Sequence, residues 1–349
     1  MQGPTGSDIR VLQVHPSLRC NLRCLHCYSE SSPQEARELS LALLQGAISD
    51  ARAEGYNVVG VSGGEPLLYS ALPQLLAHAR SLGMITSITT NGMLLTQQRI
   101  EQLRNVANLI AISLDGVAES HNRMRGAPRA FEIMTRCLEP LRQAGIPFGF
   151  IFTLTMYNLD ELEFVARFAV EQGATLLQVH PLEEVGRAKE LLLNKAPDEL
   201  ELAYAFLEVA RLQKLYADSL QIQFDVTDRS LVRQSPERIF ALDPAALPDA
   251  TRQSLSDLVS PLIIENSGHV VPIQYGFSHA YALGDLHQGR LSDFAAQWKA
   301  SRYPAFSQLC RSVCDSLLEN GRPQTPFANW YGRITQSSYA DEPLSQALG

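Results

Sequence analysis

The chain has 349 residues, of which 45% are hydrophobic and 19% are charged, and its formal net charge is -8 at pH 7. This composition excludes a chain that is disordered throughout, and the length suits one large domain or a large domain with a smaller one. Because the charge is negative and no cluster of Lys and Arg stands out, we expect no nucleic-acid partner.

The sequence predicts a protein of the cytoplasm with no membrane partner. The first residues lack the basic segment and the apolar run of a secretory signal. No stretch approaches the roughly 20 apolar residues of a membrane span. In the cytoplasm the six cysteines stay reduced, so we expect them to bind metal or do chemistry and not to form disulfides.

Short β-branched runs alternate with amphipathic stretches from residue 10 to about 215. The runs predict strands at residues 11–16, 58–62, 85–90, 109–114, 148–155 and 175–181. Helical patterns lie near 39–54, 72–82, 97–105, 130–144 and 159–172. This alternation predicts an α/β fold with a parallel sheet, and we expect functional residues just after each strand.

The pattern becomes irregular after a helical stretch at 199–217. The segment LIIENSGHVVPIQYG predicts two strands around a Ser-Gly turn. We therefore divide the chain into an N-terminal segment 1–9, a main α/β unit 10–218, a smaller α+β C-terminal extension 219–335 and a polar tail 336–349.

Three cysteines follow the first strand in the stretch CNLRCLHCY. A structural zinc site commonly takes four ligands, and His26 is too close in sequence to Cys27 to be an easy fourth. Reduced thiols without a function, the interpretation that suits Cys137, fit a triple on one loop less well. An iron–sulfur cluster is the third interpretation, and with only Cys20, Cys24 and Cys27 one iron would keep an open position.

The stretch CNLRCLHC resembles the Cys-x3-Cys-x-aromatic-Cys motif of radical S-adenosylmethionine (SAM) enzymes, with His26 in the aromatic position. The resemblance implies a partial (β/α)6 TIM-like barrel and a [4Fe-4S] cluster on Cys20, Cys24 and Cys27. It implies that SAM chelates the fourth iron and is cleaved to a 5′-deoxyadenosyl radical, which abstracts hydrogen from a substrate. It also implies an electron donor such as flavodoxin or ferredoxin.

Two further strand-end stretches agree with this resemblance. SGGEP supplies Gly63, Gly64 and Glu65, which look like the family's Gly-Gly-Glu motif at the methionine amino group. Glycine lets the backbone approach a ligand closely. TTNG supplies Thr90 and Asn91 near the ribose or methionine moiety. Taken alone, the first stretch would be a Gly-Gly turn with a capping Glu, and the second an Asn-Gly turn.

The later strand ends supply the remaining candidates. In similar enzymes a Ser and an Arg hold the methionine carboxylate, which implies Ser113 with Arg125 or Arg129; the fork of a guanidinium suits a carboxylate. Gln178 and His180 alternate on the sixth strand, so one of them should face the pocket. Weaker candidates after the fourth, fifth and sixth strands are Asp115, Thr153, Thr155, Asn158 and Arg187.

The C-terminal extension is similar in outline to the SPASM extension of many relatives. Ile273 follows Pro272 where a ligand Cys is usual, and Cys310 and Cys314 are too few for an ordinary four-thiolate site even with Cys137. We therefore predict a degenerate, twitch-like extension without an auxiliary cluster. The alternative is that Cys310 and Cys314 help to bind a cluster with other ligands.

For the substrate, the layout of the whole chain suggests an enzyme that modifies a ribosomally made peptide at an unactivated carbon. The alternative is a small-molecule substrate in cofactor or tetrapyrrole biosynthesis, since CLHCYSESS also looks like enzymes of haem side-chain modification. A non-catalytic iron–sulfur or zinc-binding module is the alternative of another class.

Overall fold

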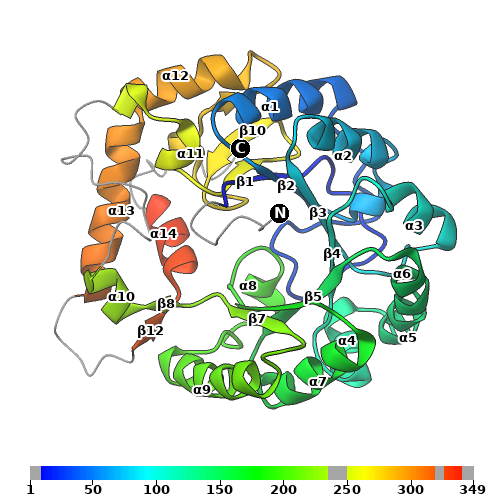
Figure 1. The fold of residues 1–349 in the computed structure, drawn as a ribbon. Coiled ribbons are helices and arrows are strands. Elements are labelled where there is room, and N and C mark those ends of the chain that lie inside the picture. The colour runs from blue at the N-terminus through cyan, green and yellow to red at the C-terminus, as the bar shows by residue number, and fades with distance from the viewer. Residues whose placement is uncertain (1–8, 235–249, 319–325, 340–349) are drawn as a thin grey trace.

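The computed structural model describes residues 9–234, 250–318 and 326–339. Its main feature is one ten-stranded sheet in the order β11-β10-β9-β1-β2-β3-β4-β5-β6-β7. Strands β1 to β7 and β9 run parallel, whereas β10 is antiparallel to both of its neighbours. The sheet curves without closing, and the helices cover its outer face (Figure 1). The predicted α/β class and partial barrel are confirmed.

The six predicted strands are all present, with ends within two residues of the prediction. They are β1 (Val11–Val14), β2 (Val58–Val61), β3 (Ile85–Thr90), β4 (Leu109–Ser113), β5 (Phe148–Leu154) and β6 (Leu176–Pro181). The runs predicted them well because both faces of a parallel strand are covered, which makes the strand apolar along its length. Side chains such as Leu12, Ile88, Ile112 and Phe150 are fully buried in the resulting core.

The predicted helices are present, with one of them divided in two, and the short helices at 118–125 and 188–191 were not predicted. The connecting helices are α1 (Leu41–Ala53), α2 (Leu72–Ser81), α3 (Gln97–Leu103), α4 (Ala118–Arg125), α5 (Ala130–Arg136), α6 (Leu138–Ala144), α7 (Leu162–Gln172), α8 (Ala188–Leu191) and α9 (Glu199–Leu215), with short 3-10 turns η2 (Pro66–Leu68) and η3 (Leu159–Glu161). The predicted helix 130–144 breaks at Cys137 because Pro140 has no N–H to continue the ladder. Gly145 and Gly173 end α6 and α7 in the left-handed conformation.

The C-terminal part of the chain continues the same sheet. Strand β7 (Gln221–Phe224), which the sequence did not predict, extends it beyond β6; β9 (Leu262–Ile264), β10 (His269–Pro272) and β11 (Gly284–Asp285) extend it beyond β1. The predicted hairpin is therefore present as β9 and β10. The other elements are β8 (Thr227–Asp228), α10 (Arg229–Gln234), η5 (Ala250–Arg252), α11 (Leu255–Leu258), η6 (His279–Tyr281), α12 (Leu291–Ser301), α13 (Tyr303–Leu318), β12 (Phe327–Ala328) and α14 (Trp330–Ser338).

The proposed domain boundaries stay a prediction, with three of the four segments partly outside the described residues, since the C-terminal extension includes the undescribed ranges 235–249 and 319–325. Residues 1–8 and 340–349 are not described, and α14 extends into the expected polar tail as far as Ser338. Cys310 and Cys314 lie on α13, and both are buried. Within the described ranges, no helix is both long and apolar enough to cross a membrane.

Ion pairs fasten the C-terminal segment to α1 at the back of the sheet. Lys299 Nζ of α12 lies 2.9 Å from Glu54 Oε2, and the backbone N–H of Leu255 donates to the same oxygen at 2.8 Å. Arg290 pairs with Asp50 one turn earlier on α1. The Lys299 side chain is only 9% exposed, so its charge depends on Glu54 for compensation.

We expect Glu54→Ala to lower the free energy of unfolding by about 2–4 kcal/mol, because it leaves a buried ammonium and a backbone donor unpaired. Urea denaturation followed by circular dichroism measures this. The control is Glu101→Ala, which removes an exposed pair with Arg104 and should change stability by less than about 0.5 kcal/mol. Equal losses in the two variants would contradict this account of the attachment.

Candidate active site

The three thiols lie together on the long loop between β1 and α1, as the sequence predicted. Cys20 and Cys24 are less than a tenth exposed and pack with Leu22, while Cys27 is half-buried at the edge of the same group. Met93 and Ala127, from loops after two other strands, complete the group. The thiols therefore share an apolar pocket at the carboxyl edge of the sheet, where ligands bind in folds of this kind.

The spacing and the chemistry of the thiols fit an iron–sulfur cluster better than one metal ion. Among the described residues, the three sulfur atoms do not converge within 4.8 Å of one another, as the ligands of a single ion must. Burial raises the pKa of Cys20 to about 12 and raises the pKa of Cys24 as well. Cys20 and Cys24 are therefore protonated without a partner, whereas ligation by iron would hold them as thiolates.

Gly63 and Gly64 press against the backbone of the thiol loop. Gly64 N–H donates to Ser17 O at 2.8 Å, and a Cβ on Gly64 would lie 2.2 Å from Arg19 O. Gly63 has a φ of +110°, and its Cβ would lie 2.5 Å from Ser17 O. The sequence attributed these glycines to close approach of a ligand; the structure gives them a second reason, the close approach of this loop.

Glu65 ties the ends of β2 and β3 together beneath the thiols. Its carboxylate accepts hydrogen bonds from Thr90 Oγ1 at 2.7 Å, from Asn91 N at 2.9 Å and from Leu67 N at 3.1 Å. Burial, the largest effect, raises the pKa of Glu65 although these donors oppose it. The Asn91 side chain then donates to Asn21 Oδ1 of the thiol loop at 2.9 Å. Asn21 was not singled out from the sequence.

A buried ion pair connects the end of β4 to the thiols. Arg125 Nε lies 2.7 Å from Asp115 Oδ2, and Arg125 Nη1 lies 3.8 Å from Cys24 Sγ. Burial, the largest single effect, would raise the pKa of Asp115, but the neighbouring basic groups, with Arg125 first, together lower that pKa. Burial lowers the pKa of both His26 and His121 to about 4, so these rings are neutral beside the pair. Arg125 thus places a guanidinium beside the Cys24 thiol.

Three further residues were predicted to contact the cofactor: Ser113, Arg129 and Gln178. Ser113 ends β4 and is buried. Arg129 points away, with its side chain 61% exposed and its Nε 2.9 Å from Glu132 Oε2, so the geometry favours Arg125 over Arg129 for a buried carboxylate. Gln178 Nε2 donates to Asp225 Oδ2 at 3.0 Å, and His180 contacts the same oxygen. The expectation that Gln178 and His180 alternate is therefore wrong, because residues two apart on a strand lie on one face.

A second polar group lies at the ends of β6 and β7. His180 Nδ1 is 2.6 Å from Asp225 Oδ2, and Glu183 accepts from Gln274 Nε2 at 3.1 Å. Burial would lower the pKa of His180, but Asp225 raises it above its ordinary value. Burial raises the pKa of Glu183. The contacts described at this rim are therefore made by two carboxyl groups and by His180, which is paired with one of them.

Arg187, a weak candidate in the sequence, holds the thiol loop in place. Its Nε donates to Cys24 O and its Nη1 to Ser31 O, both at 2.9 Å, while its backbone N–H donates to Cys27 O at 3.1 Å. The preceding Gly186 fits closely, since a Cβ there would lie 2.4 Å from Tyr28 O. Arg187 is a positioning residue, and only the fold could reveal this contact across more than 150 residues.

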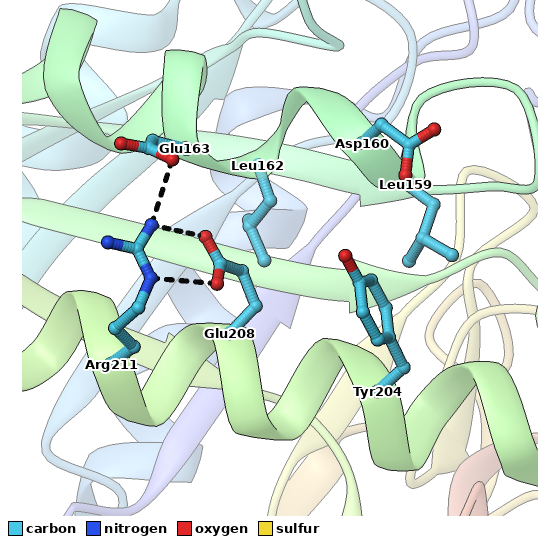
Figure 2. Close-up of a pocket in the computed structure, with 7 residues that line it drawn as sticks. All are labelled: Leu159, Asp160, Leu162, Glu163, Tyr204, Glu208 and Arg211. Atoms are coloured by element: carbon cyan, nitrogen blue, oxygen red, sulfur yellow. Dashed lines mark hydrogen bonds and ion pairs between the residues drawn. The ribbon is translucent and has the colours of Figure 1, made fainter.

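A separate cavity of about 280 Å³ lies between α7 and α9 in the outer helical layer. Figure 2 shows Arg211 of α9 reaching Glu208 on its own helix and Glu163 on α7, where Arg211 Nη2 and Glu163 Oε2 are 2.9 Å apart. Its other lining residues are Leu159, Asp160, Leu162 and Tyr204. The strand-end residues described above take no part in it, so we do not assign the chemistry there.

Comparison with known proteins agrees with this geometry. Residues 14–169 match the Radical SAM superfamily. The chain is 29% identical over 231 residues to Fe-coproporphyrin III synthase of Methanosarcina barkeri, covering 63% of this chain and 58% of that protein. It is 32% identical over 199 residues to the AdoMet-dependent heme synthase of the same organism, covering 56% and 57%.

A maturation protein is also among the relatives. The chain is 28% identical over 172 residues to the sporulation killing factor maturation protein SkfB of Bacillus subtilis, covering 49% of this chain and 42% of that protein. The chain thus spans about half the length of these curated relatives. Among solved structures, Streptococcus suis SuiB bound to precursor peptide SuiA superposes with a TM-score of 0.66 at 17% identity, over 86% of this chain and 66% of that one. That likeness shows the fold.

We expect Arg187→Lys to weaken iron retention by about tenfold while the fold is kept, because one ammonium cannot hold the two carbonyls that the guanidinium fork holds. Iron analysis during titration with a chelator measures this after anaerobic reconstitution. Lys189→Ala, an exposed change two residues away, is the control and should retain iron like the unaltered protein. Unchanged iron retention in Arg187→Lys would show that the loop does not depend on this contact.

Proposed function

Because residues 14–169 are a radical SAM domain, we propose that this protein cleaves SAM reductively and uses the product to abstract hydrogen from a peptide. Radical SAM domains work with a [4Fe-4S] cluster and SAM, and the three-thiol pocket suits that cluster in ligand type and spacing. The single observation that carries the proposal is this pocket with the Arg125–Asp115 pair beside it. The cluster, when bound, supplies one electron to the sulfonium of SAM.

We assign Cys20, Cys24 and Cys27 as the cluster ligands. The apolar pocket around them excludes water from the iron, which raises the energy of every uncompensated charge inside it. Arg125 places positive charge 3.8 Å from Cys24 Sγ and so stabilises the thiolate form. The His26 ring is neutral, because burial lowers its pKa to about 4. These residues hold the cluster and tune its charge.

The SAM contacts are assigned to the neighbouring strand ends. Glu65 already accepts three hydrogen bonds, and a carboxylate has about four acceptor sites, so it can take one more donor such as the methionine ammonium. Gly63, Gly64, Thr90 and Asn91 line this position. Ser113 and Arg125 are assigned to the methionine carboxylate, since a guanidinium has five donors and Arg125 uses few of them in its contacts with Asp115 and Cys24.

A peptide is the substrate class that the rim supports best. Asp225 and Glu183 place carboxyl groups there, and the chain has a net charge of -8. Asp225 is already paired with His180, and burial raises the pKa of Glu183, so these groups suit hydrogen bonds to the amides of a peptide better than ion pairs to the carboxylates of a tetrapyrrole. The maturation protein SkfB and the peptide-bound SuiB support this choice.

A tetrapyrrole is the second candidate substrate. It is favoured by the 32% identity to AdoMet-dependent heme synthase and the 29% identity to Fe-coproporphyrin III synthase. For either substrate we propose a cytoplasmic location and an electron donor such as flavodoxin or ferredoxin. Chemistry without a second cluster, such as epimerisation or rearrangement, suits a chain that has only Cys137, Cys310 and Cys314 besides the site cysteines.

The reaction is tested with anaerobically reconstituted protein, SAM and dithionite. We expect about four irons per chain and formation of 5′-deoxyadenosine. Cys24→Ala should abolish this product and leave the circular dichroism spectrum unchanged. Cys137→Ala is the matched control, because Cys137 lies between α5 and α6 and its thiol donates to the carbonyls of Gly92 and Ile133. A cluster-replete protein that forms no product would contradict the proposal, and about eight irons would contradict the single cluster.

The substrate class is tested by adding candidates to the same reaction. We expect a peptide encoded beside this protein's gene to increase 5′-deoxyadenosine formation and to change in mass, and coproporphyrin III to have no effect. Mass spectrometry of the peptide and chromatography of the nucleoside measure this. If coproporphyrin III is modified and the peptide is not, the second candidate replaces the first.

A further inference from the structure

A second group of metal-ligand side chains lies on the C-terminal hairpin, outside the site described above. Glu265 follows β9, His269 opens β10 and His279 opens η6. One ligand atom from each lies within 4.8 Å of the other two, and among the described residues this is the only group of three or more His, Cys, Asp or Glu side chains that meets this condition. The three residues come from a stretch of chain that turns back on itself twice.

The hairpin backbone brings the three side chains together. Glu265 N–H donates to His269 O at 2.9 Å, and Gly268 N–H donates to Glu265 O at 2.9 Å, which closes the turn. Gly268 has a φ of +94°, which favours glycine. The imidazole rings of His269 and His279 then stack with centroids 4.2 Å apart. Glu265 Oε2 lies 2.9 Å from His279 Nε2.

In Glu265 and His269, the side-chain atom that does not face the group is held by a hydrogen bond to a neighbouring residue. Gly276 N–H donates to Glu265 Oε1 at 2.8 Å, which leaves Oε2 directed at the imidazoles. Ser267 Oγ lies 3.1 Å from His269 Nδ1. When that nitrogen donates its proton to the serine, Nε2 keeps its lone pair for a metal. Metal-binding histidines are commonly oriented by such a second contact on the opposite nitrogen.

The burial of the group also suits a metal ion. The Glu265 side chain is only 7% exposed, so its charge needs compensation, while the His279 side chain is 53% exposed. A simple ion pair would use His279 alone and would give no role to the second stacked imidazole. A dication would compensate the carboxylate and use both rings, and the exposed side would leave a coordination position for water.

We propose that Glu265, His269 and His279 bind one divalent transition-metal ion, with zinc as the ion to test, independently of the three thiols. Two imidazoles and one carboxylate are a ligand set that zinc accepts with a water in the fourth position. Tyr275, which follows β10, donates to Asn266 Oδ1 at 3.0 Å and stacks on His15 of the thiol loop with centroids 4.7 Å apart. By holding the hairpin, the ion would therefore also hold this contact with the thiol loop.

The test uses the cluster-loaded protein, incubated with zinc chloride and then desalted. We expect about one zinc per chain and a higher midpoint of thermal unfolding than in the zinc-free protein. Glu265→Gln and His269→Ala should each weaken zinc binding by at least about tenfold, and Ser267→Ala by about tenfold through the outer contact. His287→Ala, a histidine close to the same turn, is the matched control and should bind zinc normally.

A second background separates this site from the thiols. In the variant with Cys20, Cys24 and Cys27 all changed to Ser, no cluster forms and we still expect about one zinc per chain. Loss of zinc in that variant would mean that the thiols had bound it, and the proposal would be overturned. It would also be overturned if the cluster-loaded protein retained no zinc, or if Glu265→Gln and His269→Ala, shown to be folded by circular dichroism, retained it with unchanged affinity.

Discussion

The site depends on how the rest of the fold holds the loop that carries the three thiols. Residues 15–38 form no helix and only isolated bridges, so their conformation comes from contacts made by other strand ends. Three residues that follow different strands contact this loop: Gly64 follows β2, Asn91 follows β3 and Arg187 follows β6. The Arg187 guanidinium donates to two carbonyls of the loop. Because these contacts converge from several strands, the cysteine pocket exists only when the sheet is assembled.

The strand ends therefore carry two groups of polar side chains, one beside the thiols and one at β6 and β7. The ends of β2, β3 and β4 supply Glu65, Asn91 and the Asp115–Arg125 pair, which surround the thiols with fixed charges and donors. The ends of β6 and β7 supply His180 and Asp225 on the far side, where a substrate is proposed to enter. In the proposed reaction, the radical would form beside the thiols and meet the substrate at the ends of β6 and β7, inside a curved sheet that limits access of water.

Much of the fold and the site could be predicted from the sequence, because the signals concerned are local. Apolar β-branched runs gave the six strands, and the spacing of Cys20, Cys24 and Cys27 gave the cluster ligands as a prediction. The edge strands β7 and β11, the division of the helix at Pro140, and the contacts of Arg187 and Asn21 were not predicted. Each depends on partners distant in the chain or, for Pro140, on a weak local signal. Arg125 and Arg129 were equivalent in sequence, and only burial distinguished them.

The central claim is that three thiolates hold a [4Fe-4S] cluster whose fourth iron is open to SAM. Electron paramagnetic resonance of the dithionite-reduced protein, recorded before and after SAM is added, tests it most directly. The account predicts the signal of a reduced [4Fe-4S] cluster whose g-values shift when SAM binds to the open iron. A reduced-cluster signal that SAM leaves unchanged, or a spectrum with no such signal in iron-replete protein, would contradict it.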